Sequence, residues 1–320
     1  MIFRHDDMRD DPLPRIVVVG SVNMDFTVYV PHLPRPGETL SGEQFMVAPG
    51  GKAGNQAIAA ARLGANVSLI ACVGDDEFGP RLRASLETDR IDCAGVSVIP
   101  GCASGIAMVV VDPSGCNSIV TVEGSNGKLT PDLAARHLQA CPTPRLILCE
   151  LTMPMSTVER ILAMANEASV PVLLNASPVR GVLPAHLLKL VEYLVVNEVE
   201  AAILSGQPLD SVEDAMSAAH ALRAAGARNV LVTLGAKGAV TCFAGENEPR
   251  IEFLPAEPVV AIDSTGAGDT FAGAFATAIV AGASDTKAVK FAQSAAAICV
   301  TRTGAAPSIP YLWELPSACI

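Results

Sequence analysis

The stretch Ala261-Ile-Asp-Ser-Thr-Gly-Ala-Gly-Asp-Thr-Phe-Ala-Gly-Ala-Phe275 places a Gly-x-Gly turn directly before a helix. Gly266 and Gly268 allow a tight turn, and the N–H groups of Gly266, Ala267 and Gly268 would lie at the positive end of that helix. Backbone N–H groups at a helix start bind anions without a basic side chain. The turn therefore predicts an anion hole built from neutral donors.

Asp269 follows this turn in the first turn of the helix. A carboxylate beside an anion hole would repel a phosphate ligand, but it could take a proton from a hydroxyl group that attacks the phosphorus. The positive helix end would favour the ionised form, which predicts a modest base. For an isolated Gly-x-Gly-Asp, the alternative is that Asp269 only caps the helix. The segment is not a dinucleotide fingerprint, because Phe271 stands where the third glycine would be, and the sequence has no P-loop motif.

Outward from this turn, strands and helices alternate along most of the chain. The predicted strands are 16–20, 67–73, 145–149, 170–174, 193–196 and 230–234. The predicted helices are 55–63, 77–87, 157–168, 212–225, 267–281 and 286–300. This alternation predicts an α/β fold, a doubly wound and mainly parallel sheet with helices on both faces.

Two stretches break the alternation, residues 26–47 and 104–122. The second reads as two strands, 105–111 and 118–122, joined by the turn Asp112-Pro-Ser-Gly115. Strands without helices between them predict a small β lid that stands off the main domain and excludes water from a cleft. A decorated edge of the main sheet is the alternative. Residues 16–320 are expected to form one domain with this lid, and the polar residues 1–15 a disordered tail.

Composition narrows the possible partners. The chain has 320 residues, half of them hydrophobic and 17% charged, which suits a folded domain with a large core. Its net charge of −11 argues against a nucleic acid partner but not against a phosphate-bearing small molecule. No membrane span or signal peptide is apparent, so a cytoplasmic protein is expected. Nine cysteines without a C-x-x-C pair predict reduced thiols in the core rather than disulfides or zinc.

Two further segments carry polar groups in places where ligands bind. Val47-Ala-Pro-Gly-Gly-Lys-Ala-Gly-Asn-Gln-Ala57 is a glycine turn running into a helix, and Lys52 and Asn55 are donors suited to hydroxyl oxygens. Gly20-Ser-Val-Asn-Met-Asp25 lies at the carboxyl end of the first strand, where ligands collect in open α/β sheets. Asp25 could accept hydrogen bonds from two neighbouring sugar hydroxyls. The alternatives are an ordinary turn for the first segment and a cap or turn role for Asp25.

With Asn197-Glu-Val-Glu200 and Thr233-Leu-Gly235, these segments occur in the order and spacing of the ribokinase-like (PfkB) carbohydrate kinases. The chain resembles this family over residues 16–312. The closing run Val300-Thr-Arg-Thr-Gly-Ala-Ala-Pro-Ser308 looks most like the ribokinase branch.

The resemblance implies a role for each matching residue. Asp269 is the implied catalytic base, and Gly266, Ala267 and Gly268 form the anion hole. The sugar-binding positions are Asn23, Asp25, Gly51, Lys52 and Asn55. The implied nucleotide site comprises Asn197 and Glu200, which organise Mg²⁺ and phosphate, then Thr233, Gly235, Lys237 and Gly238, and Gln293 at the adenine. A K⁺ site is implied at Asp263, Thr265, Cys299, Arg302, Gly304 and Ser308.

The implied activity is transfer of the γ-phosphoryl group of ATP to the primary hydroxyl of a pentose, with D-ribose first. Deoxyribose, a ketohexose or a nucleoside is the alternative acceptor, and the aliphatic lid stretch 105–111 favours a plain sugar over a nucleoside. ATP, Mg²⁺ and K⁺ are the implied cofactors, and a homodimer through the lid is expected. A non-catalytic sugar sensor is a different reading, but it would be expected to lose Asp269 or the glycine turn.

The chain departs from the family pattern in two places. Ala53 and Gly54 are exchanged relative to the usual Gly-Gly-Lys-Gly-Ala-Asn. The family segment Gln-Leu-Glu-x-Pro appears as Glu150-Leu-Thr-Met-Pro154, so Thr152 replaces the glutamate that contacts the sugar. Glu150 would lie on the same face of a strand, displaced by about 7 Å, and is the alternative sugar contact. Both Glu150 and Thr152 are therefore candidate sugar contacts.

Overall fold

The computed structural model describes residues 15–113, 115, 117–179 and 181–316. Its main sheet has the strand order β13-β12-β11-β10-β9-β8-β1-β4-β5. The bounds are β1 Arg15–Val19, β4 Asn66–Gly74, β5 Asp92–Ile99, β8 Leu146–Glu150, β9 Val172–Asn175, β10 Tyr193–Asn197, β11 Asn229–Thr233, β12 Gly238–Phe243 and β13 Arg250–Pro255. Neighbours from β5 to β11 pair in parallel, whereas β12 and β13 pair antiparallel at one edge.

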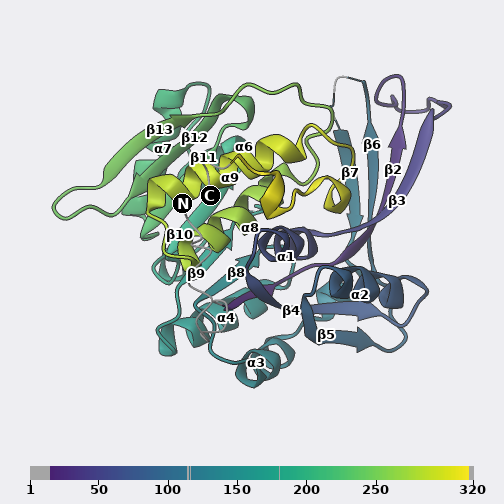
Figure 1. Ribbon diagram of the computed structural model, residues 1–320, viewed down its shortest axis with the longest axis horizontal. Coiled ribbons are helices and arrows are strands. Elements are labelled where there is room, and N and C mark those ends of the chain that lie inside the picture. The colour runs from purple at the N-terminus through teal and green to yellow at the C-terminus, as the bar shows by residue number, and fades with distance from the viewer. Residues whose placement is uncertain (1–14, 114, 116, 180, 317–320) are drawn as a thin grey trace.

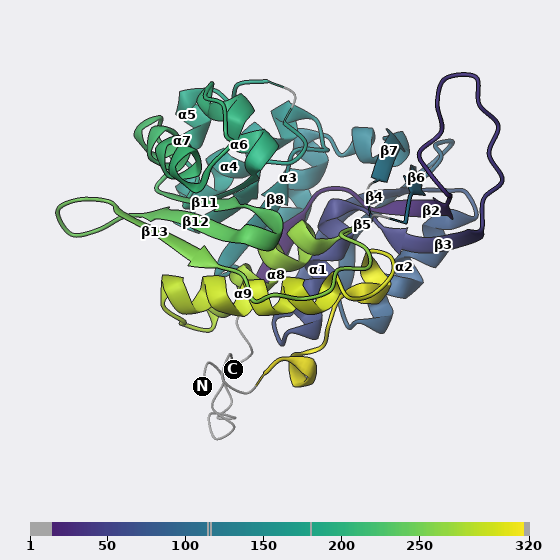
Figure 2. The same cartoon turned by 90° about the horizontal axis from the view of Figure 1, so that it is seen from above.

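Helices cover both faces of this sheet because its central strands are apolar on both sides. In β1, Ile16 and Val18 belong to one buried core and Val17 and Val19 to the other. The first core is closed by α1 Lys52–Arg62, α2 Phe78–Thr88, α8 Ala267–Val280 and α9 Asp285–Cys299. The second is closed by α3 Pro131–Ala140, α4 Met155–Glu167, α5 Ala185–Leu188, α6 Glu198–Ser205 and α7 Val212–Ala224. The view from above separates these two helix layers (Figure 2). This is the doubly wound fold that the sequence predicts.

A second sheet stands off one side of the main domain (Figure 1). Its strands are β2 Asn23–Tyr29, β3 Gln44–Gly50, β6 Gly105–Val111 and β7 Asn117–Val122, in the order β3-β2-β6-β7. Strand β2 pairs parallel with β6, and the outer strands β3 and β7 pair antiparallel with them. Both irregular stretches of the sequence therefore build one small sheet, which we call the lid.

Several details differ from the sequence prediction. Strands β5, β12 and β13 and helices α3, α5 and α6 were not predicted. Arg15 is the first residue of β1 rather than the last of a tail, and the rest of the predicted tail, residues 1–14, lies outside the described residues. No helix in the described part of the chain is long and apolar enough to cross a membrane.

Candidate active site

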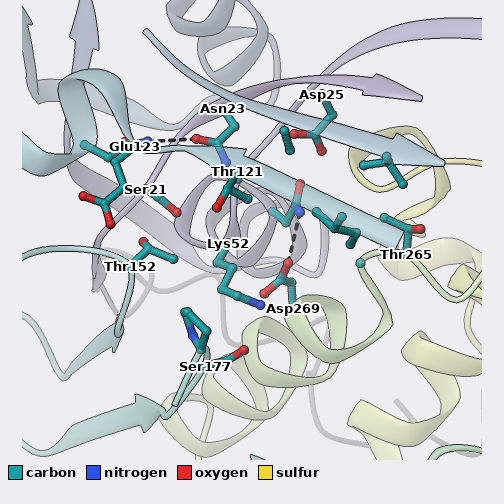
Figure 3. A pocket seen from close by; sticks show the side chains of 18 of the residues that line it. Ser21, Asn23, Asp25, Lys52, Thr121, Glu123, Thr152, Ser177, Thr265 and Asp269 are labelled. Carbon is teal, nitrogen blue, oxygen red and sulfur yellow. Dashed lines mark hydrogen bonds between the residues drawn. The ribbon is translucent and has the colours of Figure 1, made fainter. Parts of the chain in front are cut away.

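Two adjoining cavities lie where the lid meets the carboxyl ends of the main-sheet strands. The larger, of about 450 Å³, extends from the inner lid residues Val109 and Thr121 to the segments that follow β1, β8 and β9. The smaller, of about 190 Å³, extends over the ends of β9, β10 and β11. Four residues line both cavities, namely Lys52, Ser177, Gly266 and Asp269. The predicted base therefore lies where the two cavities meet. Figure 3 shows Asp269 among the residues that line the larger one.

The turn before α8 places Asp269 at this junction. Gly266 is the residue that caps α8, and its φ of 81° is a left-handed conformation that favours glycine. A Cβ atom there would also lie 3.1 Å from the Cα of Ala305. Asp269 follows in the first helical turn and is 8% exposed. Its side chain accepts hydrogen bonds from another helix, so it is not a simple helix cap.

Both oxygens of the Asp269 carboxylate are held by amides of α1. Asn55 Nδ2 donates to Oδ2 at 3.0 Å, and Gln56 Nε2 donates to Oδ1 at 2.9 Å. Burial raises the pKa of Asp269, while the charge of Lys52 and these two hydrogen bonds oppose that rise. From the sequence, the helix terminus is expected to keep the carboxylate ionised and a modest base. This expectation is corrected, because desolvation is the largest effect and makes Asp269 a stronger base.

Two of the three N–H groups predicted to bind an anion are unpaired within the described part of the chain. The N–H group of Ala267 donates to the carbonyl of Ser264 at 3.2 Å and is not available to a ligand. The N–H groups of Gly266 and Gly268 form no hydrogen bond with any residue that the structure describes. Both glycines line the smaller cavity, and a Cβ at Gly268 would meet nothing within 4 Å. Two of the three predicted donors are thus free to bind an anion in that cavity.

Lys52 supplies positive charge to the junction. It is the first residue of α1, directly after Gly51, which caps that helix and lines the larger cavity. Its side chain extends toward Asp269 between the two cavities (Figure 3). A cation here can attract an anionic group in the smaller cavity.

The lid supplies polar groups to the larger cavity from β2. Asn23 Oδ1 accepts a hydrogen bond of 2.8 Å from Asn126 Nδ2, and Asn126 is itself held by the N–H group of Val22 at 3.0 Å. Asp25 Oδ1 is buried and has no hydrogen-bond partner among the described residues. Burial and the charge of Asp269 raise the pKa of Asp25 to about 7. Asn126 was not predicted as a site residue, although the polar run Glu123-Gly-Ser-Asn-Gly127 directly after a lid strand was a usable signal.

Thr152, not Glu150, reaches the larger cavity. Thr152 lines it, whereas Glu150 is fully buried behind it. Glu150 Oε1 accepts hydrogen bonds from the Ser21 N–H at 2.6 Å and the Thr152 hydroxyl at 2.6 Å, and its Oε2 accepts the Thr152 N–H. The prediction that Glu150 could contact a sugar directly is therefore corrected, because the described protein groups already occupy its carboxylate. Its effect on the cavity is to orient Thr152.

The predicted nucleotide residues are only partly together. Asn197, Glu200 and Thr233 line the smaller cavity. Asn197 and Glu200 form a reciprocal capping box at the start of α6, each with a 2.9 Å hydrogen bond, which fixes both side chains.

The other predicted nucleotide residues lie outside both cavities. Gly235 and Lys237 form a short 3₁₀ turn, Gly238 begins β12, and Lys237 Nζ lies 3.5 Å from Glu198. Gln293 lies on α9, and its amide donates to the Leu254 carbonyl at 2.8 Å. Their contacts with a nucleotide stay a prediction.

The predicted cation residues gather around Asp263. This carboxylate is 1% exposed, and it accepts hydrogen bonds from the N–H groups of Thr265 at 2.9 Å and Gly304 at 2.8 Å. It forms no ion pair within the described ranges. Cys299 Sγ lies 3.0 Å from Ser308 Oγ in the same cluster.

Arg302 is the exception in this set, because its guanidinium pairs with Glu314 at 2.6 Å. Only its backbone carbonyl could then serve a cation beside Asp263.

Comparisons with known proteins show the family to which the chain is similar. Residues 13–312 match the model of the pfkB family of carbohydrate kinases. Ribokinase of Haemophilus influenzae is 38% identical over 295 residues, which cover 92% of this chain and 95% of the relative. Deoxyribokinase of Salmonella typhimurium is 35% identical over 298 residues, with coverages of 92% and 95%. The solved structure of Arabidopsis thaliana ribokinase complexed with ribose and ATP has a TM-score of 0.81 at 32% identity, over 94% of this chain and 97% of that chain.

Proposed function

Since the chain belongs to the pfkB family of carbohydrate kinases, we infer that it transfers the γ-phosphoryl group of ATP to the primary hydroxyl of a pentose, with D-ribose as the acceptor. The position of Asp269 where the two cavities meet carries this inference. A sugar in the larger cavity can present a hydroxyl to the carboxylate. A phosphoryl group in the smaller cavity can meet the N–H groups of Gly266 and Gly268.

The residues at the junction suit an in-line phosphoryl transfer. Asp269 takes the proton of the attacking hydroxyl, and Lys52 with the two free N–H groups stabilises the charge on the transferring group. Such a transition state is loose, so positioning and charge stabilisation contribute more than strong basicity. The burial of Asp269 and the lid above the cavity keep bulk water from competing as acceptor.

The lining of the larger cavity favours a plain sugar. Ala107, Val109 and Ile119 present aliphatic side chains from the lid, with no aromatic ring to stack on a nucleobase among the described lining residues. Polar groups of Asn23 and Asp25, from strand β2 of the same lid, and of Thr152, from the segment after β8, suit several neighbouring hydroxyls. Deoxyribose, a ketohexose or a nucleoside is the alternative acceptor.

We propose that Mg²⁺ binds at Glu200, with Asn197 beside it. Glu200 lines the smaller cavity, Oε2 is fixed by the capping box, and Oε1 forms no hydrogen bond with described residues. A carboxylate oxygen in a phosphate-sized cavity is a ligand that Mg²⁺ prefers, directly or through water. When bound, the ion would neutralise charge on the phosphate oxygens.

We also propose that K⁺ binds beside Asp263, with carbonyl oxygens of the loops that carry Thr265, Cys299, Arg302 and Gly304, and with Ser308. A buried carboxylate without a charged partner is costly, and a monovalent cation would balance it. Thr265 Oγ1 is buried and lacks a partner among the described residues, which also fits an additional ligand there. When bound, the ion would strengthen the positive field at the anion hole.

The lid supports the proposal of a homodimer. Met108 and Val120 lie opposite each other on β6 and β7, and they are 49% and 64% exposed. Their neighbours Val109, Ile119 and Thr121 face the cavity, so Met108 and Val120 point to the outer face of the lid. A second copy of the chain would cover this apolar face and the free edge of β7. The cytoplasmic location and the absence of a nucleic acid partner stay predictions.

An assay of ADP release across acceptors tests the proposed function. Purified protein with ATP, Mg²⁺ and K⁺ would be given pentoses, deoxyribose, ketohexoses and nucleosides in turn. D-Ribose is expected to give the highest kcat/KM, with the phosphate on its primary hydroxyl. Higher kcat/KM for another acceptor would replace D-ribose, and no ADP release with any sugar would reject the kinase assignment.

A further inference from the structure

We propose that Gln56 is a positioning residue for Asp269, which ties Oδ1 from the buried side and leaves Oδ2 to receive the hydroxyl proton. This inference rests on the proposed function. Gln56 Nε2 donates to Oδ1 at 2.9 Å, whereas Asn55 Nδ2 donates to Oδ2 at 3.0 Å. Asn55 lines the larger cavity, and Gln56 is fully buried and is not part of the described lining of either cavity. The two amides thus separate the carboxylate into a cavity side and a buried side.

The packing of α1 against α8 fixes Gln56 in this place. Gly273 of α8 lies so close to α1 that a Cβ atom there would be 2.5 Å from the Gln56 carbonyl oxygen. One turn further along, Thr277 Oγ1 donates to the Gly273 carbonyl at 2.9 Å and to the Ala60 carbonyl at 3.4 Å. The helices therefore cannot slide past each other without breaking close contacts. Since Gln56 and Asp269 are on these two helices, their register sets the hydrogen bond.

The orientation of the Gln56 amide follows from the carboxylate. A flipped amide would point Oε1 at Oδ1, oxygen against oxygen. In the observed orientation Oε1 is buried and has no hydrogen-bond partner among the described residues. A buried amide oxygen without a donor is unfavourable, and an apolar side chain would fill the same volume without that cost. The contact with Asp269 is the feature that a buried glutamine supplies here and an apolar residue does not.

A carboxylate held by one donor on each oxygen accepts a proton better from one fixed direction. With both oxygens held, the group cannot rotate, and the free lone pair of Oδ2 keeps its direction toward the cavity. Loss of the Gln56 donor frees rotation and removes one hydrogen bond from the ionised form. The other charged or titratable groups that act on Asp269 are Lys52, which favours its ionised form, and Asp25 and the Cys299 thiol, whose own pKa values its charge raises.

The test compares Gln56→Met and Gln56→Glu with wild type in saturating ATP, Mg²⁺ and K⁺, from pH 5.5 to 9. Gln56→Met should lower the plateau of kcat about tenfold and leave the KM for ribose within about twofold, because Gln56 does not touch the sugar. The acidic limb of the pH profile of kcat should move up by about one pH unit, because the ionised form of Asp269 loses a hydrogen-bond donor. Gln56→Glu should move it further, because a second carboxylate would face Asp269. If Gln56→Met does not fold, Gln56→Glu alone carries the test.

Thr277→Val is the matched control. It removes another buried polar link between α1 and α8 but does not touch Asp269. It should lower the thermal midpoint and leave the pH profile of kcat unchanged. The proposal is overturned if the Gln56 variants keep the wild-type pH profile, or if Thr277→Val shifts it equally. Wild-type protein that phosphorylates ribose in the same assay shows that such a failure concerns Gln56 and not the proposed function.

Discussion

Asn55 Nδ2 donates a hydrogen bond of 3.0 Å to Oδ2 of Asp269, across 214 positions of sequence. Asn55 belongs to the helix that follows the lid strand β3, and Asp269 to the helix that follows the glycine turn. This contact joins the cavity proposed for the sugar to the group proposed as the base. A sugar hydroxyl that forms a hydrogen bond with Asn55 would therefore lie within reach of Asp269.

The raised pKa of Asp25 predicts a pH-dependent stability. With a pKa of about 7 in the folded protein and near 3.8 when unfolded, Asp25 takes up a proton on folding at pH values between these two. The free energy of unfolding should therefore fall as pH rises from about 4 to 7, and the penalty is complete above pH 7. Asp25→Asn removes the penalty and should raise the Tm of the ligand-free protein at pH 8 by on the order of 2–4 °C, with little change at pH 4. An equal change in Tm at both pH values would contradict this assignment.

The cluster around Asp263 predicts activation by K⁺. Replacing K⁺ with Na⁺ should lower kcat roughly tenfold, about 1.4 kcal/mol of transition-state stabilisation. Asp263→Asn should remove the difference between the two cations, because the amide carries no charge to hold either. Wild-type kinetics that are indifferent to the cation would reject the site.

The position of Thr152 predicts that its substitution changes the affinity for the sugar but not the rate of phosphoryl transfer. The Thr152 hydroxyl donates its hydrogen bond to Glu150, so toward the cavity its oxygen can act only as a hydrogen-bond acceptor. Thr152→Val should raise the KM for ribose about 2- to 10-fold, the effect of one net hydrogen bond, with kcat nearly unchanged. Thr152→Ser keeps the hydroxyl and is the control. Equal KM values for the valine and wild-type proteins would show that Thr152 makes no sugar contact.

The outer face of the lid predicts a concentration-dependent dimer. Light scattering at micromolar protein should give twice the mass of the chain, and Val120→Asp should reduce it to a single copy because the new charge would be buried against the partner. Ile203→Asp makes the same change at a 44% exposed site on α6 and should leave the dimer intact. A wild-type protein that sediments as one copy would remove the lid interface.

Local patterns predicted the elements of the fold better than the contacts between them. The alternation of short apolar runs and helices predicted the parallel sheet, and the turn Asp112-Pro-Ser-Gly115 predicted the β6–β7 hairpin of the lid. The antiparallel strand β12, which lies between β11 and the edge strand β13, was missed because it begins directly after the 3₁₀ turn Gly235–Lys237. A short strand in this place is easily assigned to a loop or to the preceding glycine segment.

The candidate site depended most on non-local packing. Motif spacing gave the residues near Asp269, but the second amide on its carboxylate comes from α1 through helix packing that no local pattern encodes. The pKa of Asp269 is raised because the whole fold buries the carboxylate, an effect larger than that of the helix terminus. Likewise, the choice between Glu150 and Thr152 depended on how the chain leaves β8, which turns Thr152 toward the cavity and Glu150 away from it.

The most direct measurement of the central claim is single-turnover phosphoryl transfer from ATP to ribose by Asp269→Asn, alongside ATP affinity for the same protein. Asparagine keeps the shape of the side chain but cannot take the hydroxyl proton. The rate of transfer should fall by about 10²–10⁴-fold while the Kd for ATP stays within about twofold of wild type. A variant that transfers phosphate within tenfold of the wild-type rate would show that Asp269 is not the base.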